Sequence, residues 1–152
     1  MPEPVLWTIE TSLKTALDNI DGTGTYFYNL TSVYGDTAYD NFPGDYASLG
    51  LSDVQREADE TQGKYYWRAT FDVSVHVAPV SGREPQQQMI QAWSDVQTAV
   101  MADPNRTVSA VKYAIDTQVL TPRLIDGTDH RIGVTVPVEV YYRNSITDPT
   151  SL

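Results

Sequence analysis

The sequence predicts an α+β domain: a twisted, mostly antiparallel sheet with two helices on one face and a long acidic loop or hairpin excursion. Three observations predict this fold. Apolar residues recur with helical spacing in two segments, strict alternation marks two long strands, and one segment between them is acidic and poor in apolar residues. The 152 residues fit a single domain, 1–152, without disulfides or metals, because folding at this length buries roughly 68–70% of the chain's surface.

The first two expected elements are a helix and a strand. Between Pro4 and Ile20 apolar residues follow one another at three- and four-residue steps, which predicts a helix of about 14 residues. Pro4 suits the first turn, and Asp21-Gly22 is typical of a helix end. Residues Tyr26 to Tyr34 are rich in aromatic and β-branched side chains and therefore predict a strand.

Residues 35–64 form the acidic excursion. Seven acids and Arg56 lie between Asp36 and Gly63, which gives a charge of −6, whereas 13 acids and nine bases elsewhere give −4 of the total −10. A short apolar piece from Tyr46 to Leu51 predicts a minor strand there. The excursion is either a solvated loop or a projecting arm whose charge faces a particular partner.

The second half begins with a strand and a helix. Alternation from Tyr65 to Val77 predicts a long, half-buried strand. A helix over Gln86 to Val100 follows. Ser81 with Glu84 has the spacing of a capping box at its start, although Pro85 could move that start. The helix carries an apolar stripe of Met89, Trp93, Val96 and Val100.

Two further strands are expected near the end of the chain, over Thr107 to Val119 and His130 to Arg143. Because proline cannot donate to a sheet ladder, Pro137 implies an edge position or a bulge in the last strand. Residues 144–152 are polar and predict a flexible tail.

Composition excludes several classes of function. The absence of cysteine removes disulfides, thiol nucleophiles and thiolate zinc sites. A net charge of −10 argues against nucleic-acid binding, no apolar run is long enough for a membrane helix, and the N-terminus has no signal-like pattern. The motifs of serine hydrolases, P-loop proteins, zinc proteases and kinases are missing. We therefore expect no enzyme, no cofactor and no metal site.

The two histidines do not change this expectation. His76 falls on the polar side of the long strand, where a surface role is the simpler interpretation. His130 ends the segment 126–130, which could offer ligands to a metal, but Asp and Gly there are typical of a hairpin turn.

Aromatic residues on the expected strands favour an assembly subunit. The chain has 10 Tyr, 3 Trp and 3 Phe, more than one sheet face against two helices can hide. Tyrosine is enriched at protein interfaces, although it is also a good strand former.

The order of elements and several local segments resemble the tail terminator (tail completion) proteins of long-tailed bacteriophages. The resemblance covers nearly the whole chain. It is carried by the opening helix with Leu13, Ala16 and Leu17, the tyrosine-rich first strand, Phe42-Pro43, the long alternating strand, the helix of Gln86 to Val100 and the segment Val136 to Tyr142.

The resemblance implies a virion structural protein that is assembled in the host cytoplasm. It would form a homohexameric ring on the head-proximal end of the tail tube, end tube polymerisation and bind head-completion or stopper proteins, while DNA passes through the ring. Its partners would be itself, the tail tube protein and the head-completion protein, with no membrane. The alternatives are another head-tail joining or minor tail protein, a small aromatic-strand binding module, and a small hydrolase that uses His76 or His130.

The acidic excursion supplies most of the candidate interface residues. It is expected to project and either pack on a neighbouring subunit or the tube, or line the channel so that like charge keeps DNA from sticking. The candidate interface or lumen residues are Asp53, Arg56, Glu57, Asp59, Glu60, Lys64, Tyr141 and Arg143.

Overall fold

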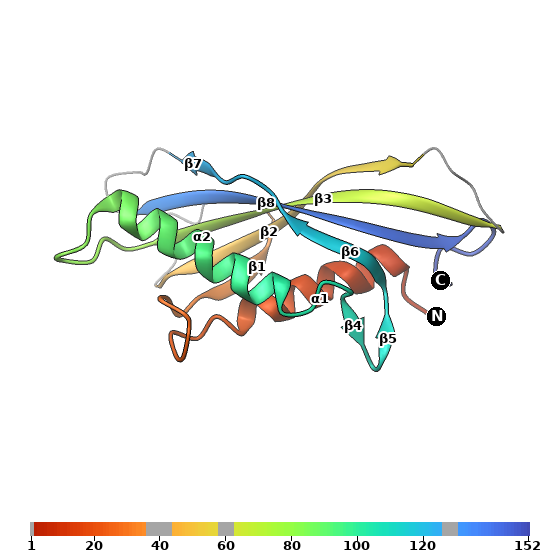
Figure 1. The fold of residues 1–152 in the computed structure, drawn as a ribbon, viewed down its shortest axis with the longest axis horizontal. Helices are drawn as coiled ribbons and strands as arrows, with labels where there is room; N and C mark the ends of the chain where they lie inside the picture. The colour runs from red at the N-terminus through yellow and green to blue at the C-terminus, as the bar shows by residue number, and fades with distance from the viewer. Residues whose placement is uncertain (1, 36–43, 58–62, 126–130) are drawn as a thin grey trace.

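A computed structural model describes residues 2–35, 44–57, 63–125 and 131–152 (Figure 1). Within these ranges, the elements in chain order are α1 Val5–Asp18, β1 Thr31–Tyr34, β2 Tyr46–Arg56, β3 Lys64–Val77, α2 Pro85–Met101, β4 Thr107–Val108, β5 Val111–Lys112, β6 Ala114–Val119, β7 Arg123–Ile125 and β8 Ile132–Ser145.

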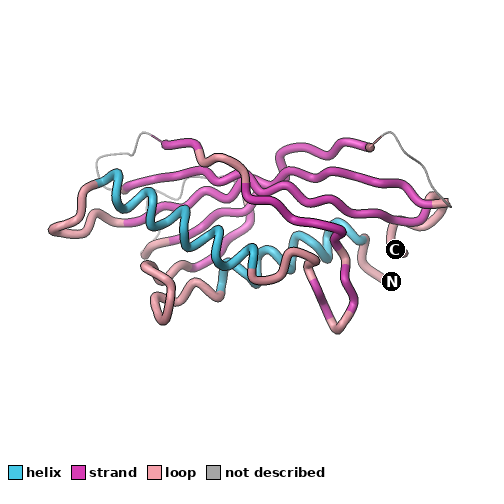
Figure 2. The backbone as a smooth tube through the Cα atoms, in the orientation of Figure 1, coloured by secondary structure: helices cyan, strands magenta, loops and turns pink. Residues whose placement is uncertain are grey.

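The described strands form a six-stranded sheet and a separate hairpin. The sheet has the order β1-β2-β3-β8-β6, and β7 pairs with β8 beyond the end of β6. β1 is parallel to β2, and the other pairs are antiparallel. α1 and α2 pack on one face of the sheet, as Figure 2 shows. The predicted α+β fold is therefore confirmed. The other face of the sheet, which the helices do not cover, is polar and is called the open face below.

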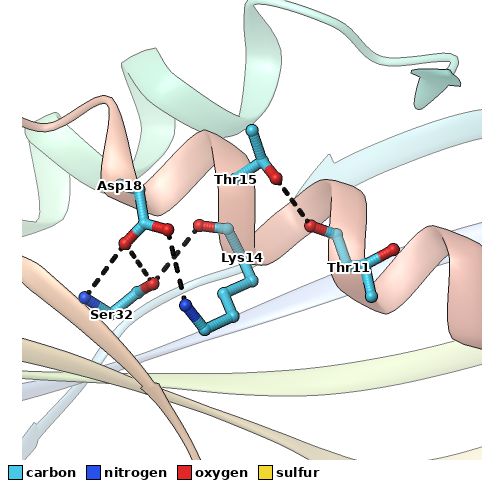
Figure 3. Close-up of polar contacts among 5 residues, drawn as sticks. All are labelled: Thr11, Lys14, Thr15, Asp18 and Ser32. Carbon is cyan, nitrogen blue, oxygen red and sulfur yellow. Dashed lines mark hydrogen bonds and ion pairs between the residues drawn. The ribbon is translucent and has the colours of Figure 1, made fainter. Parts of the chain in front are cut away.

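α1 matches the predicted helix. Its apolar spacing buries Val5, Ile9, Leu13 and Leu17 in the core. Near its end, Asp18 ties the helix to β1, because its carboxylate accepts hydrogen bonds from the amide and the hydroxyl of Ser32 (Figure 3). Lys14 adds an ion pair to Asp18 at 3.4 Å. These contacts hold β1 against the end of α1.

The strand expected over Tyr26 to Tyr34 is wrong in its first half, because only Thr31–Tyr34 forms β1. The amides of Phe27 and Tyr28 donate to the carboxylate of Asp95 on α2, at 3.0 and 2.9 Å. These amides are therefore hydrogen-bonded without pairing to a neighbouring strand. Asp95 is only 1% exposed, and burial raises its pKa although these bonds lower it. A hydrogen bond between residues 68 positions apart in the sequence thus overrides the local strand propensity.

β2 is longer than the minor strand expected over Tyr46 to Leu51. It extends through Arg56 and lies between β1 and β3 in the sheet. Its first four residues are buried, whereas its second half is mostly exposed and polar and pairs with β3 on one side. Backbone pairing with β3 extends the strand where side-chain burial gives no signal.

β3 and α2 are confirmed, but the capping box is wrong. Glu84 is the N-cap residue, with no side-chain hydrogen bond, and Pro85 opens the helix. The apolar stripe also contains a buried amide: Gln88 accepts from the Val80 amide at 2.9 Å and donates to the Ala78 carbonyl at 3.0 Å. Gln88 thereby holds the loop between β3 and α2.

The single strand expected over Thr107 to Val119 is wrong, because the segment forms β4, β5 and β6. Ser109 and Ala110 have φ of 49° and 65°, the conformation of a two-residue hairpin turn in which both central residues have positive φ. Neither residue is the Asn or Gly that would announce such a turn in a sequence.

The last strand is confirmed as β8, but the edge or bulge inferred from Pro137 is wrong. β8 lies inside the sheet, with β3 on one side and β6 and β7 on the other. β6 pairs as far as Val138 and β7 begins at Thr135, so Pro137 sits where one neighbour gives way to the next. Its missing N–H therefore costs no ladder bond, and its carbonyl accepts from the Leu120 amide at 2.8 Å.

Residues 144–152, expected to be flexible, make several contacts. The Val5 amide donates to the Pro149 carbonyl at 3.0 Å, and the Ser145 amide donates to the Ser151 carbonyl at 2.8 Å. Leu152 packs against the core. Both chain ends thus lie at the same end of the molecule as the end of β2 and the start of β3 (Figure 1).

Candidate assembly surface

The predicted interface residues gather at the end of the sheet that α2 does not reach, here called the arm: Asp53–Glu57, Lys64–Thr70 and Glu139–Ser145 (Figure 1). Asp53 and Arg56 lie in β2, Glu57 follows it, Lys64 opens β3, and Tyr141 and Arg143 lie in β8. Asp59 and Glu60 lie outside the described residues. The structure thus brings six of the eight predicted side chains into one three-stranded region.

Arg68 joins two of these residues on the open face. Its guanidinium contacts the Glu57 carboxylate at 2.5 and 2.7 Å and lies over the ring of Tyr141, 5.6 Å from the centroid. The Tyr141 hydroxyl donates to Glu139 at 2.6 Å. The hydrogen bond to Glu57 raises the pKa of Arg68, and the hydrogen bond to Glu139 raises the pKa of Tyr141.

Sequence reasoning missed Arg68 and Glu139. Alternation along the long strand places Arg68 on its polar side, but the contact of Arg68 with Tyr141 depends on the β3–β8 register, which pairs these two positions directly. Alternation assigns a residue to a face, whereas register decides which neighbour it meets.

Two of the remaining predicted residues, Arg56 and Lys64, make contacts elsewhere in the arm. Arg56 lies over the ring of Tyr65, 4.8 Å from the centroid, on the helix side. Lys64 donates to the Leu152 carbonyl, and Arg143 is exposed opposite Tyr66. The tail of the chain and the start of β3 are therefore held together.

A shallow groove of about 580 Å³ crosses the arm. It is lined by Glu57, Tyr66, Trp67, Ile115, Asp116, Tyr141 and Tyr142. Tyrosine rings and carboxylates together suit a cationic side chain, because a ring face attracts a cation and a carboxylate pairs with it. The groove can therefore receive a lysine or arginine from another protein.

The described residues hold no group of three or more His, Cys, Asp or Glu side chains that could bind a metal ion. His76, the half-buried histidine of β3, stacks on Tyr46 with ring centroids 4.8 Å apart. His130 lies outside the described residues. None of the helices in the described ranges is long and apolar enough to cross a bilayer.

Comparison with known proteins gives a structural likeness and no sequence family. No family model matches the chain, and no curated protein matches it. A chain from the virion of a native gene transfer agent particle is 15% identical, with 93% of this chain and 92% of that chain covered and a TM-score of 0.48.

A second solved structure is similar to this chain with a TM-score of 0.52. It comes from an extracellular contractile injection system, described as the PVC sheath/tube terminator in the extended state. The identity is 15%, and the match covers 91% of this chain but 56% of that one, so the chain spans about half the length of this relative. The likeness establishes a shared fold.

Proposed function

We propose that this protein is a virion structural subunit that forms a ring on the head-proximal end of a phage tail tube. The ring ends tube polymerisation, joins the tail to head-completion proteins and lets DNA pass through its lumen. The observation that carries the proposal is the fold likeness, over 91% of the chain, to a chain from a sheath/tube terminator structure. The order of elements and the local segments that resemble those of tail terminators also support it.

The charge and surface of the chain are compatible with this role. A conduit for DNA must not hold the genome, and a subunit of charge −10 repels phosphates. A ring needs two different surfaces that fit each other, because a head-to-tail contact closes only when repeated around an axis. The arm, with its aromatic and acidic groove, is one such surface, and the projecting β4–β5 hairpin with exposed Val111 and Lys112 is another.

Electron microscopy of the purified protein mixed with tail tubes tests the proposal. The expected result is a cap at one end of each tube and no further growth of capped tubes. Tubes that keep growing with bare ends, at protein in excess over tube ends, would contradict it.

A combined charge variant tests whether the acids in the arm and in the segment after β2 contribute to capping or to DNA passage. Asp53→Asn and Glu57→Gln, combined with Asp59→Asn and Glu60→Gln, should leave the fold intact and either weaken capping or slow DNA ejection. A control neutralises two exposed acids outside the arm, Glu3→Gln and Glu84→Gln, and should change neither capping nor DNA ejection. Equal behaviour of the two variants would assign the arm's acids to solvation alone.

The tyrosine-lined groove favours a second candidate, a small binding module. This candidate predicts a monomer at every concentration by light scattering and no cap on tubes. If the protein is such a module, Tyr66→Ala and Tyr141→Ala should abolish the binding of its ligand. The wild-type protein would then not cap tubes, as the first proposal requires it to do.

A further inference from the structure

Two strands of the sheet carry the same local motif, an aspartate and a glutamine two residues apart. In β2 the Gln55 side chain donates to Asp53 at 2.9 Å, and in β6 the Gln118 side chain donates to Asp116 at 3.3 Å. β2 and β6 lie on opposite sides of the β3–β8 pair. The motif thus occurs once near each edge of the sheet.

The outer side of β6 is covered by the segment that precedes the β4–β5 hairpin. The Ala114 amide donates to the Asn105 carbonyl at 2.9 Å, and the Asn105 amide group donates back to the carbonyls of Ala114 and Ile115 at 3.3 and 3.1 Å. Thr117, the central residue of the motif, is 0% exposed, and its hydroxyl donates to the Pro104 carbonyl. This side of the sheet is the capped edge.

The outer side of β2 differs. β1 pairs with β2 only as far as Leu49, and among the described residues no strand lies beside Asp53–Arg56, which is called the open edge. The Glu57 amide donates inward to the Tyr66 carbonyl, and inward and outward groups alternate along an antiparallel strand. The N–H and C=O groups of Val54 and Arg56 therefore point outward.

The open edge is complementary to itself. If two copies align antiparallel about Val54, each Val54 exchanges two backbone hydrogen bonds with its counterpart, and Asp53 of one copy lies opposite Gln55 of the other. A glutamine amide has two N–H donors, of which the internal bond to Asp53 uses one, so the second can reach the opposite carboxylate. Each pair across the seam thus matches a donor with an acceptor.

We propose that the free protein pairs with a second copy of itself through the open edge, with Val54 on the two-fold axis. The contact joins two sheets into one and satisfies the outward backbone groups that an unprotected edge would present. The capped edge takes no part, because Thr117 is buried. This proposal goes beyond the ring: a two-fold contact closes on itself and does not build a ring, so the two are separable.

Sedimentation and cysteine cross-linking test the pairing. The wild-type protein should show twice its 16.9 kDa mass as concentration rises. Because the chain has no cysteine, Val54→Cys introduces a single thiol, and its oxidation should give covalent dimers, since the paired Cα atoms would lie about 5.5 Å apart. Ile115→Cys, an exposed position beside the capped edge, is the control, and its oxidation should give no covalent dimers.

Paired charge variants test the proposed register. Gln55→Glu places like charges opposite each other twice across the seam and should weaken the dimer roughly tenfold or more. Gln118→Glu makes the same change at the capped edge and should leave the dimer unchanged. Circular dichroism of each variant checks its fold.

Three results would overturn the pairing: a monomer at every concentration up to ~1 mM, cross-linking of Val54→Cys no greater than that of Ile115→Cys, or equal weakening of the dimer by Gln55→Glu and Gln118→Glu. Tube capping is tested separately by electron microscopy, and a failure to cap tubes would leave the pairing intact. The pairing and the proposed function therefore stand or fall separately.

Discussion

The capped edge and the open edge of the sheet have similar chemistry and opposite surroundings. Both carry an aspartate, a β-branched residue and a glutamine in succession. At β6 the segment around Asn105 covers this motif, whereas at β2 the neighbouring strand β1 has already ended. The exposure of a strand edge therefore depends on what packs beside it and not on the residues of the strand itself.

The largest effect is expected at the anchor of the capped edge. The buried guanidinium of Arg106 donates to the carbonyls of Val100 and Asp103, where α2 ends and the covering segment begins. Arg106→Ala should lower the free energy of unfolding by roughly 3 kcal/mol or more, because it opens a cavity and removes the donor to the buried Val100 carbonyl. Urea unfolding measures this loss.

Arg123→Ala is the control for that prediction. The Arg123 side chain is 68% exposed and meets Asp72 at 3.4 Å, so its removal should change stability by about 0.5 kcal/mol or less. Equal losses in the two variants would mean that Arg106 does not anchor the covering segment.

A second prediction concerns the reason why β1 is short. Asp95→Ala deprives the amides of Phe27 and Tyr28 of their acceptor and should cost roughly 2–3 kcal/mol in urea unfolding. If β1 instead lengthens to include these residues, hydrogen exchange at both amides will remain slow in the variant, and the explanation of the short strand will be wrong.

Asp95 also makes stability depend on pH. Burial raises its pKa above the ordinary 3.8, so the folded protein holds this proton more tightly than the unfolded chain does. The contribution is fully present below pH 3.8 and is lost as pH rises through the raised pKa. The pH dependence of stability should therefore contain a component that begins at the ordinary pKa of an aspartate and extends to higher pH, and Asp95→Asn should remove it. An unchanged dependence of stability on pH would assign this component to another group.

A third prediction compares the central residues of the two motifs. Thr117→Val removes the hydroxyl bonded to Pro104 and should cost about 1 kcal/mol. Val54→Thr, at the half-buried equivalent position, should change monomer stability by about 0.5 kcal/mol or less. A larger loss at Val54 than at Thr117, measured by thermal unfolding in dilute solution, would reverse the assignment of the two edges.

The smallest effect is expected in the arm. Glu57 and Arg68 form an ion pair whose side chains are both 36% exposed, so Glu57→Gln should cost about 0.5 kcal/mol. The loss should shrink in high salt, because ions screen exposed pairs. A salt-independent loss well above this size would mean that the arm is part of the folded core.

Sequence periodicity predicted the parts of the fold that one apolar face determines. The spacing from Val5 to Leu17 and the alternation along β3 and β8 report burial directly. The wrong predictions involve contacts that periodicity does not encode: Asp95 binding Phe27, positive φ at Ser109, and a change of neighbour at Pro137.

The candidate surface was predictable to a similar degree. The exposure pattern identified Glu57 and Tyr141 as surface residues, but Arg68 between them required the strand register. The open edge depends on where β1 ends, and the second half of β2 carries no apolar signal. Edges and registers are set by tertiary packing, and a single sequence does not display them.

Hydrogen exchange at Val54 and Thr117 provides the sharpest test of the contrast between the two edges. In dilute protein, the Thr117 amide should exchange at least ~100-fold more slowly than the Val54 amide, because only Thr117 is covered. Raising the concentration should slow exchange at Val54 and leave Thr117 unchanged. Equal exchange rates at the two amides at every concentration would contradict the account.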